Sequence, residues 1–419
     1  HCFILINNSF YMAKRWRDRL VRKNLTYNFR MLYFARITIN SATQLMGLFL
    51  PIFLYQFLDF SLSLVIVYYL IIDLLYLGLV VYGCRGIMNR WGIKKSLQIS
   101  ILFGAIYYSF FFLINHYLLA GDFTALGSKI WWLVPTIFLS LFFRLTHWIP
   151  FHTSLATLTD RSIRASQLSF LEATILALGA VMPLVAGLAL EYLGYSWLFL
   201  LAVIIYLISW LPFSRLPQVK EKFSWSYGET WRRLFSKKNK DNFLAYAGSG
   251  AESVVGSVVW PIFIWELLSG NYLGVGAISS VIIIFTIILQ MVVGYFLDRR
   301  PNRRRWLRYG TWLYSLGWVL KALVNSALQV FLFSTYHNLS RVFAKTPFDA
   351  LNYDIAADHG HYVDEYTVTR EMAIAIGKAI MSVLILVIIP FMSLRWVFVV
   401  AALASLFMFL LNVEEIYSD

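Results

Sequence analysis

Several ionisable side chains of this 419-residue chain lie inside long apolar stretches. A charge at the centre of a lipid bilayer costs at least about 2.5–3.5 kcal/mol, so such residues indicate ion pairing, proton binding or recognition of a charged solute. They are Asp73, Arg144, His147, Glu172, Glu252, Lys321, Arg341, Lys345 and Lys378, with His152 and Asp349 closer to the ends of their stretches.

Two of the arginines occur in the same local pattern. Arg144 and Arg341 each begin a segment in which five residues separate the arginine from a Pro-Phe pair. A guanidinium can hold a carboxylate or phosphate through two parallel hydrogen bonds, so the pair could bind an anion. The alternative is structural: Arg144 pairs with Glu172, and Arg341 pairs with Glu371, to brace neighbouring helices.

Two acids lack a counterpart elsewhere in the chain. An offset of 210 residues, which relates other matching segments, aligns Glu252 with Ala42. A carboxylate in a low-dielectric cavity can bind a proton and release it when its access changes, so Glu252 is a candidate for proton or cation coupling. A structural ion pair is the alternative. Asp73 is a second coupling candidate, for which a structural or gating contact is the alternative.

Composition indicates which elements position these residues. The chain is 59% hydrophobic with a mean hydropathy of +0.66, which indicates a membrane protein. Its apolar runs are about 20 residues long and continuous, as membrane-spanning helices require. We predict about twelve spans. They cover residues 32–57, 61–84, 96–118, 131–156, 166–190, 195–213, 243–267, 273–297, 305–326, 328–354, 368–392 and 394–413.

The net charge of +14 is explained by topology and not by nucleic-acid binding. Lys and Arg gather in alternate connections, around residues 14–30, 90–95, 161–164, 232–240 and 299–308. Basic loops stay on the cytoplasmic side of a membrane. We therefore expect a multi-pass protein of the cytoplasmic membrane with both termini in the cytoplasm.

The chain contains one half repeated. Pro51-Ile-Phe-Leu-Tyr matches Pro261-Ile-Phe-Ile-Trp, and Asn89-Arg90 matches Asp298-Arg299 about 209 residues later. An even number of spans separates the copies, so they face the same way across the membrane. The predicted parts are a cytoplasmic segment 1–30, a six-helix bundle 31–213, a cytoplasmic linker 214–241 that could lie on lipid head groups, a second six-helix bundle 242–413 and a tail 414–419.

The basic connection after the second span resembles the loop motif of the major facilitator superfamily. That motif has the form Gly-x-x-x-Asp-Arg-x-Gly-Arg-Lys-Lys. The chain matches it at Arg90, Gly92, Lys94 and Lys95, whereas Asn89 stands in place of the acidic residue. In the family this loop latches the cytoplasmic side, so the resemblance implies a gating loop here.

The second copy of the motif keeps other positions. Gly294, Asp298 and Arg299 match it, while Pro301 and Asn302 occupy its centre. The acidic position is therefore intact only in the second half. The resemblance extends from about residue 30 to 411.

Membership of that superfamily would imply an all-α fold of two six-helix halves around a central cavity lined by spans one, four, seven and ten. Arg144, Glu252 and Arg341 would then face the substrate path, with Trp260 near it. Arg144 also resembles the arginine of the family's antiporter motif, although Trp148 occupies the motif's glycine position.

The function expected from these observations is secondary active transport of a small solute, either an amphipathic compound or an organic or phosphate anion. Alternating access coupled to a proton or another ion would drive it. We expect a monomer whose partners are the solute, the coupling ion and membrane lipids. The alternative is a transporter-like receptor, assembly partner or lipid scramblase, which the neutral Asn89 favours.

Other classes have little support. His147 and His152 are five residues apart, whereas helical metal pairs favour a spacing of four, so we expect no metal. Glycine-rich phosphate loops and nucleophile–base sets are lacking, so we expect neither an enzyme nor a cofactor. The two cysteines do not suggest a disulfide framework.

Overall fold

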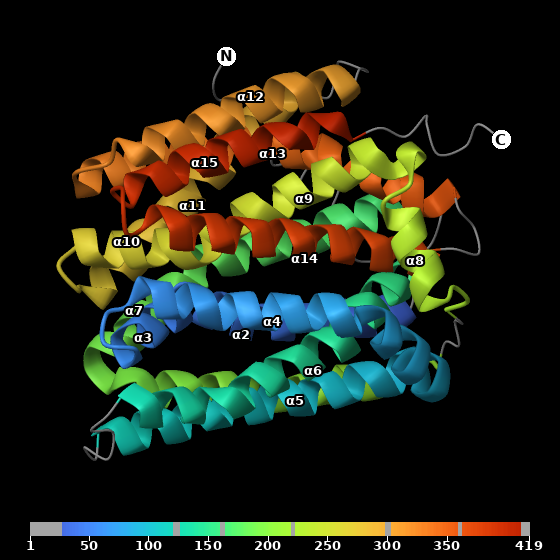
Figure 1. Cartoon of the computed structure of the whole chain (residues 1–419), viewed down its shortest axis with the longest axis horizontal. Coiled ribbons are helices and arrows are strands. Elements are labelled where there is room, and N and C mark those ends of the chain that lie inside the picture. Colours follow the sequence, from blue (N-terminus) through green and yellow to red (C-terminus); the bar gives the residue numbers. More distant parts are fainter. Residues whose placement is uncertain are drawn as a thin grey trace, which may run out of the picture.

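A computed structural model of the chain describes residues 27–119, 126–159, 164–218, 223–297, 303–358 and 363–411. Within these ranges the regular elements are helices, and the long ones run side by side along one direction (Figure 1). Backbone groups in lipid must find their hydrogen-bond partners within the same segment, which favours helices for these apolar runs. The all-α prediction is confirmed.

The first half begins with a bent helix pair, α2 (Tyr27–Gly47) and α3 (Phe49–Phe57), with an angle of 43° between them. The elements that follow are α4 (Leu62–Gly83), a π-helical turn η1 (Cys84–Met88), α5 (Asn89–Leu119), α6 (Leu126–Leu158) and α7 (Arg164–Ser214).

The second half follows a connecting segment that contains the short helix α8 (Tyr227–Leu234) and the turn η2 (Lys237–Asn239). Its elements are α9 (Lys240–Val254), a π-helical turn η3 (Val255–Val259), α10 (Trp260–Leu267), α11 (Tyr272–Leu297), α12 (Arg303–Ala322), α13 (Ala327–Asp358), α14 (Val363–Ile388), α15 (Arg395–Leu406) and η5 (Phe407–Leu410).

Glycines at positive φ mark two of the boundaries between spans. Gly92 has a φ of 73° and Gly194 a φ of 76°, a conformation that costs other residues energy. At Gly194 the long α7 breaks into two rods, in agreement with the predicted spans 166–190 and 195–213. Gly92 similarly turns the chain into the main part of α5.

Length and composition identify most of these helices as membrane spans. Six helical stretches of the described chain are long and apolar enough to cross a membrane, or seven when the bent pair α2 and α3 counts as one span. Two of the six, Leu62–Tyr117 and Phe170–Ser214, are 56 and 45 residues long, so each contains two crossings. The long helices described number twelve when α2 with α3 and α9 with α10 each count as one, α7 counts as two and the short α8 is left out.

The helices form two groups that correspond to the two halves of the sequence. In Figure 1 the blue to green helices occupy one side of the molecule and the yellow to red helices the other. The groups meet where α4 packs on α14 and where α7 packs on α11. This arrangement agrees with the predicted repeat, and the exact boundaries at 31–213 and 242–413 stay a prediction.

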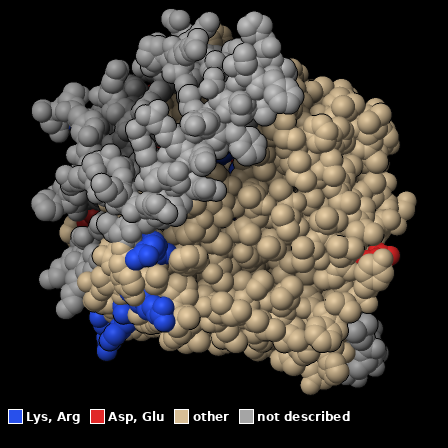
Figure 2. Space-filling model, turned by 180° about the vertical axis from the view of Figure 1, so that it is seen from behind, with Lys and Arg blue, Asp and Glu red and all other residues tan. Residues whose placement is uncertain are grey.

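The surface has the character of a lipid-facing one. Most of the described surface in Figure 2 carries neither acidic nor basic side chains, and Lys and Arg gather near one edge. Large apolar side chains such as Trp131, Ile208, Leu313 and Val387 are exposed on the helices. An exposed apolar area of this extent requires a lipid environment.

Close backbone contacts hold helices together inside the second half. A Cβ atom added to Gly377 on α14 would collide with the carbonyl oxygen of Ala247 on α9, and one added to Gly250 would collide with the carbonyl of Ile374. Small residues of this kind allow helices in lipid to approach closely. The position of α9, which carries Glu252, therefore depends on these glycines.

We predict that Gly377→Leu destabilises the second half, because α14 must move away from α9 to accommodate the side chain. Overpacking of a tight contact costs about 1–3 kcal/mol. The measurement is thermal unfolding of the purified chain in detergent. Gly78→Leu is the matched control, since a Cβ at Gly78 has no atom within 4 Å. Equal melting temperatures for the two variants would contradict the prediction.

Candidate functional site

Glu252 lies at the centre of a buried polar cluster in the second half. It is 4% exposed, and the Tyr314 hydroxyl on α12 donates to its Oε2 over 2.7 Å. The Nζ atom of Lys345 on α13 lies 3.8 Å from Oε1 of the same carboxylate and donates to Ser249 Oγ over 2.6 Å. Three helices thus converge on one buried carboxylate that is held by one cation and one phenol.

One face of α13 carries a series of titratable side chains. His337, Arg341 and Lys345 are spaced four residues apart and therefore lie along the same face of the helix. Arg341 interacts electrostatically with Glu252 and Tyr314, yet its side chain is exposed although it lies in the interior of α13. The accessible surface of Arg341 leaves its guanidinium available to water or a solute.

Lys321 on α12 lies at the opposite side of the same cluster. It is 4% exposed, with Nζ 4.4 Å from the ring centre of Trp260 and 4.5 Å from that of Trp318. The two indole faces stabilise the ammonium group. Trp260 is 7% exposed and also packs against Phe398, so it lies behind the cluster. The contact of Trp260 with substrate stays a prediction.

The first half contains its own buried ion pair. Arg144 on α6 lies 2.7 Å from Asp73 on α4, and its guanidinium stacks over the Tyr76 ring at 4.3 Å. The suggested structural pairing of Arg144 with Glu172 is wrong, because the acid that pairs with Arg144 is Asp73. Glu172 lies exposed on α7, where it interacts electrostatically with Arg36.

The suggested pairing of Arg341 with Glu371 also needs correction. Glu371 on α14 lies 3.8 Å from Arg370. Lys378, on the same helix, interacts electrostatically with Asp73, Arg144 and Glu371. Because α14 packs on α4, these residues form a charge cluster across the boundary between the two halves, whereas Arg341 belongs to the Glu252 cluster.

Arg36 on α2 was missed in the sequence analysis. Its guanidinium lies 4.3 Å from the Phe151 ring centre and 5.4 Å from that of Trp148, both on α6. The signal was available, since Arg36 falls inside the predicted span 32–57.

Cations outnumber acids in the charged clusters of the described chain. The acids are Asp73, Glu172, Glu252, Asp349, Glu365 and Glu371, and the cations are Arg36, Arg144, Lys321, Arg341, Lys345, Arg370 and Lys378, so the excess among these residues is one positive charge. Isolated charge in a low-dielectric interior is costly, so this excess favours an anion as a ligand.

The two halves join directly at one end of the bundle, and these contacts would close any passage between them there. The Tyr55 hydroxyl on α3 donates to Glu266 on α10, and the Tyr272 hydroxyl on α11 donates to Gln56 over 2.9 Å. Trp265 stacks on Phe60 beside these bonds. First-half and second-half residues therefore join directly at this end, which the charge distribution predicts to be extracellular.

The connecting segment bridges the halves at the other end. The Asn89 side chain donates to the Phe223 carbonyl over 3.1 Å and accepts from the Phe223 amide over 2.9 Å. The next residue, Ser224, donates its amide and hydroxyl to Glu365 on α14 over 2.8 Å and 2.6 Å. Adjacent residues of the segment thus contact both halves.

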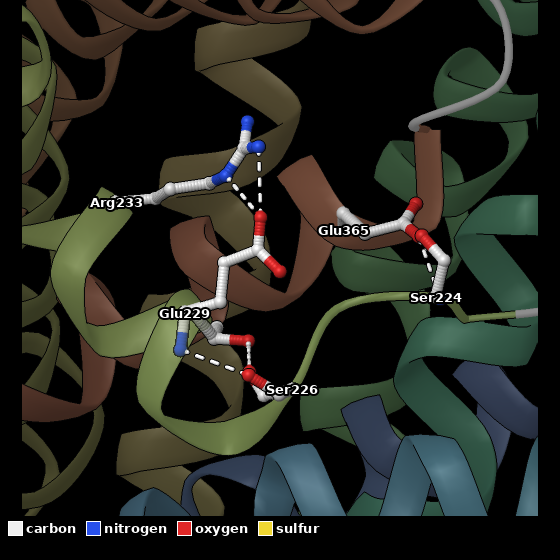
Figure 3. Close-up of polar contacts among 6 residues, drawn as sticks. Ser224, Ser226, Glu229, Arg233 and Glu365 are labelled. Atoms are coloured by element: carbon white, nitrogen blue, oxygen red, sulfur yellow. Dashed lines mark hydrogen bonds and ion pairs between the residues drawn. The ribbon is translucent and has the colours of Figure 1, made fainter.

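Local interactions hold the start of α8 beside this bridge. Figure 3 shows Ser224 pointing toward Glu365, with Ser226, Glu229 and Arg233 grouped on α8. Ser226 accepts from the Glu229 amide over 3.2 Å as an N-cap, and Arg233 pairs with Glu229 at 2.8 Å. The helix therefore begins at a fixed point next to the bridge.

The structure also explains why an amide replaces the acid of the loop motif at Asn89. An amide can donate and accept at once, whereas a carboxylate can only accept. Of the other predicted gating residues, Arg90 and Lys95 are exposed and Lys94 is half-buried. Asp298 and Arg299 lie outside the described residues, and the gating role of the loop stays a prediction.

These features define an all-helical multi-pass membrane protein with buried charged clusters. No protein-family model matches the chain, and no curated protein matches it. Solved structures do match.

A POT family transporter in complex with a thioalcohol-conjugated peptide has a TM-score of 0.68, and one in complex with 5-aminolevulinic acid has a TM-score of 0.66. Both are 12% identical to this chain, and each comparison covers 91% of this chain and 94% of the other. A mutant of a POT peptide transporter in complex with sulfate has a TM-score of 0.64 at 12% identity, covering 91% and 92%. The chain has the fold of the major facilitator superfamily, which confirms the predicted resemblance at the level of the fold.

We predict that Asn89→Asp releases the connecting segment from the first half, because the new carboxylate cannot donate to the Phe223 carbonyl. The loss of this part-buried hydrogen bond costs about 0.5–1.5 kcal/mol. Faster amide hydrogen exchange at residues 223–226 is the readout. Asn271→Asp serves as control, since Asn271 Oδ1 accepts from the Gly274 amide and an Asp can do the same. Unchanged exchange in Asn89→Asp would show that the bridge does not depend on the amide.

Proposed function

We propose that this chain is a secondary active transporter that carries a small anionic solute together with a proton. The observation that carries the proposal is the buried pair of Glu252 and Lys345 beside the exposed guanidinium of Arg341. A carboxylate that can accept a proton and cations that can accept an anion thus lie at one place in the bundle.

The excess of cations supports an anion as the substrate. Arg341 offers a planar set of donors suited to carboxylate, sulfate or phosphate groups, and Lys345 lies one helical turn away on the same face. The ligands named for two of the similar structures, sulfate and 5-aminolevulinic acid, each carry an acidic group. They supply chemical probes for this chain. The predicted amphipathic substrate remains compatible with this site only if it carries such a group.

Proton coupling follows from the cost of an unpaired buried charge. An anion that binds to Lys345 draws it away from Glu252, so the buried carboxylate loses the cation that lies within ion-pair distance of it. Such a carboxylate is strongly destabilised, and binding a proton relieves that cost. Anion and proton therefore bind cooperatively, and by linkage each raises the affinity for the other.

Alternating access supplies the movement across the membrane. The contacts of Tyr55 with Glu266 and of Gln56 with Tyr272 hold one end closed, and the exposed Arg341 indicates an opening toward the other end. Exchange of these contacts as the two halves rock would expose the site to the other side. We place both termini and the connecting segment in the cytoplasm, on the basis of the charge distribution.

The alternative of a receptor, assembly partner or scramblase loses its main support. It rested on the neutral Asn89, and hydrogen bonds to both polar groups of the Phe223 backbone give that amide a role in which no charge is needed. Transport is therefore the function that the site supports best.

We predict that Glu252→Gln abolishes accumulation driven by a pH gradient and leaves counterflow exchange intact, because the amide cannot carry a proton. Uptake of labelled sulfate and 5-aminolevulinate into proteoliposomes, with and without a pH gradient, measures both activities. Glu191→Gln, at an exposed position on α7, is the control. Full accumulation by Glu252→Gln would refute the coupling role. If wild type moved neither probe, the proposal of anion transport would fail.

A further inference from the structure

We propose that Tyr314, His337 and Lys321 form a proton pathway that reaches Glu252 from the closed end of the bundle, separate from the passage between the halves. The inference rests on the proposed function, since it concerns how the coupling carboxylate is protonated.

The three side chains form a continuous series within the second half. The Tyr314 hydroxyl donates to Glu252, and the ring centre of His337 lies 4.5 Å from that of Tyr314. The His337 ring also lies 4.5 Å from the Trp318 ring, on which the Lys321 ammonium rests at 4.5 Å. Lys321 also interacts electrostatically with Glu252.

Helical spacing places these residues in line. Tyr314, Trp318 and Lys321 are separated by four and three residues, so they lie along one face of α12. That face packs against α13, which carries His337. All four side chains are almost fully buried. The series therefore crosses the interior of the half as a polar column in an otherwise apolar interface.

Polar atoms along the column lack a hydrogen-bond partner within the described chain. They include His337 Nδ1 and, about one turn earlier on the same face of α13, Ser334 Oγ. Buried polar atoms are usually satisfied by protein or by ordered water, so this region suits water molecules that relay protons. Gly317 contributes space, since a Cβ there would lie 2.7 Å from His337 Nδ1.

The column opens toward the end where the passage between the halves is shut. Lys321 is the penultimate residue of α12, and residues 325–328 beyond it are exposed. At the same end, Tyr55 and Glu266 join the two halves. A proton can thus approach Glu252 from a side from which a solute cannot.

The other charges near the column direct the proton to Glu252. Arg341 and Lys345 face it from α13 and carry positive charge, and the described part of α15 contributes only Arg395, which bonds to Asn325 at the exposed end. Among the described residues that face the column, Glu252 is the acid. Lys345 Nζ lies 3.8 Å from Oε1 of that carboxylate, and in this proposal it blocks onward release until a substrate anion displaces it.

The transfer balances without any other reactant. Lys321 gives a proton toward His337 and regains one from the aqueous side. Coordinated transfer along the imidazole, water and the Tyr314 hydroxyl then delivers one proton to the Glu252 carboxylate. Only N–H and O–H bonds form and break, and the phenol and imidazole end in their initial protonation states.

The test uses proteoliposomes that contain the full chain and a pH-sensitive dye, with a potassium diffusion potential and no substrate. Lys345→Ala removes the block, so proton influx should rise at least about tenfold over wild type. This rise is smaller than the roughly 10²- to 10⁴-fold rate increase that a positioned proton donor or acceptor typically contributes. Adding His337→Phe, or Tyr314→Phe in a second variant, should return the influx to the wild-type level. Adding His116→Phe, an exposed histidine of the first half, should leave it high.

Absence of influx in Lys345→Ala, or influx that both His337→Phe and Tyr314→Phe leave unchanged, would overturn the pathway. Elution of each variant as a single species by size-exclusion chromatography verifies its folding. Sulfate and 5-aminolevulinate uptake by the wild-type chain is measured in parallel. If neither probe moves while the influx depends on His337, the proposed transport function fails and the pathway stands.

Discussion

The cost of charge in a low-dielectric interior is the constraint on which the rest of this structure depends. Each buried ion needs a counter-ion, a polar partner or access to water. Arg144 meets this need with Asp73, Lys321 with two indole rings, and Glu252 with Lys345 and Tyr314. In the proposed function, the remaining excess of positive charge attracts an anion, and displacement of Lys345 from Glu252 couples anion binding to protonation.

The two halves contribute differently to this arrangement. The first half neutralises Arg144 internally and meets the second through the Lys378 region of α14. In the second half, Tyr314, Lys321, Arg341 and Lys345 gather around Glu252. Contacts at the two ends of the bundle are also different in kind. Side chains of both halves join directly at one end, and the connecting segment bridges them at the other through Asn89 and Glu365.

The sequence could predict the fold because its signals are local or repeated. Apolar runs of membrane length, basic connections and duplicated segments predict the twelve-span, two-half architecture. It could also identify most of the buried ionisable residues, since each interrupts an apolar run. Partners were harder to predict. Asp73, not Glu172, pairs with Arg144 because α4 and α6 meet at that depth, and hydropathy does not report how helices are rotated.

The role of Asn89 shows the same limitation. As a departure from a loop motif it suggested a lost latch, whereas the backbone of Phe223, more than a hundred residues away, supplies the reason for an amide. The neighbours of His337 likewise could not be predicted, because the sequence does not show which side chains of other helices pack against a single histidine in a span.

The central claim is that anion and proton bind together at the pair of Glu252 and Lys345. The most direct test is isothermal titration of the purified chain with sulfate or 5-aminolevulinate, whichever binds more tightly, in buffers of different ionisation enthalpy. The account predicts uptake of about one proton for each anion bound. Binding without proton uptake, or with proton release, would contradict it.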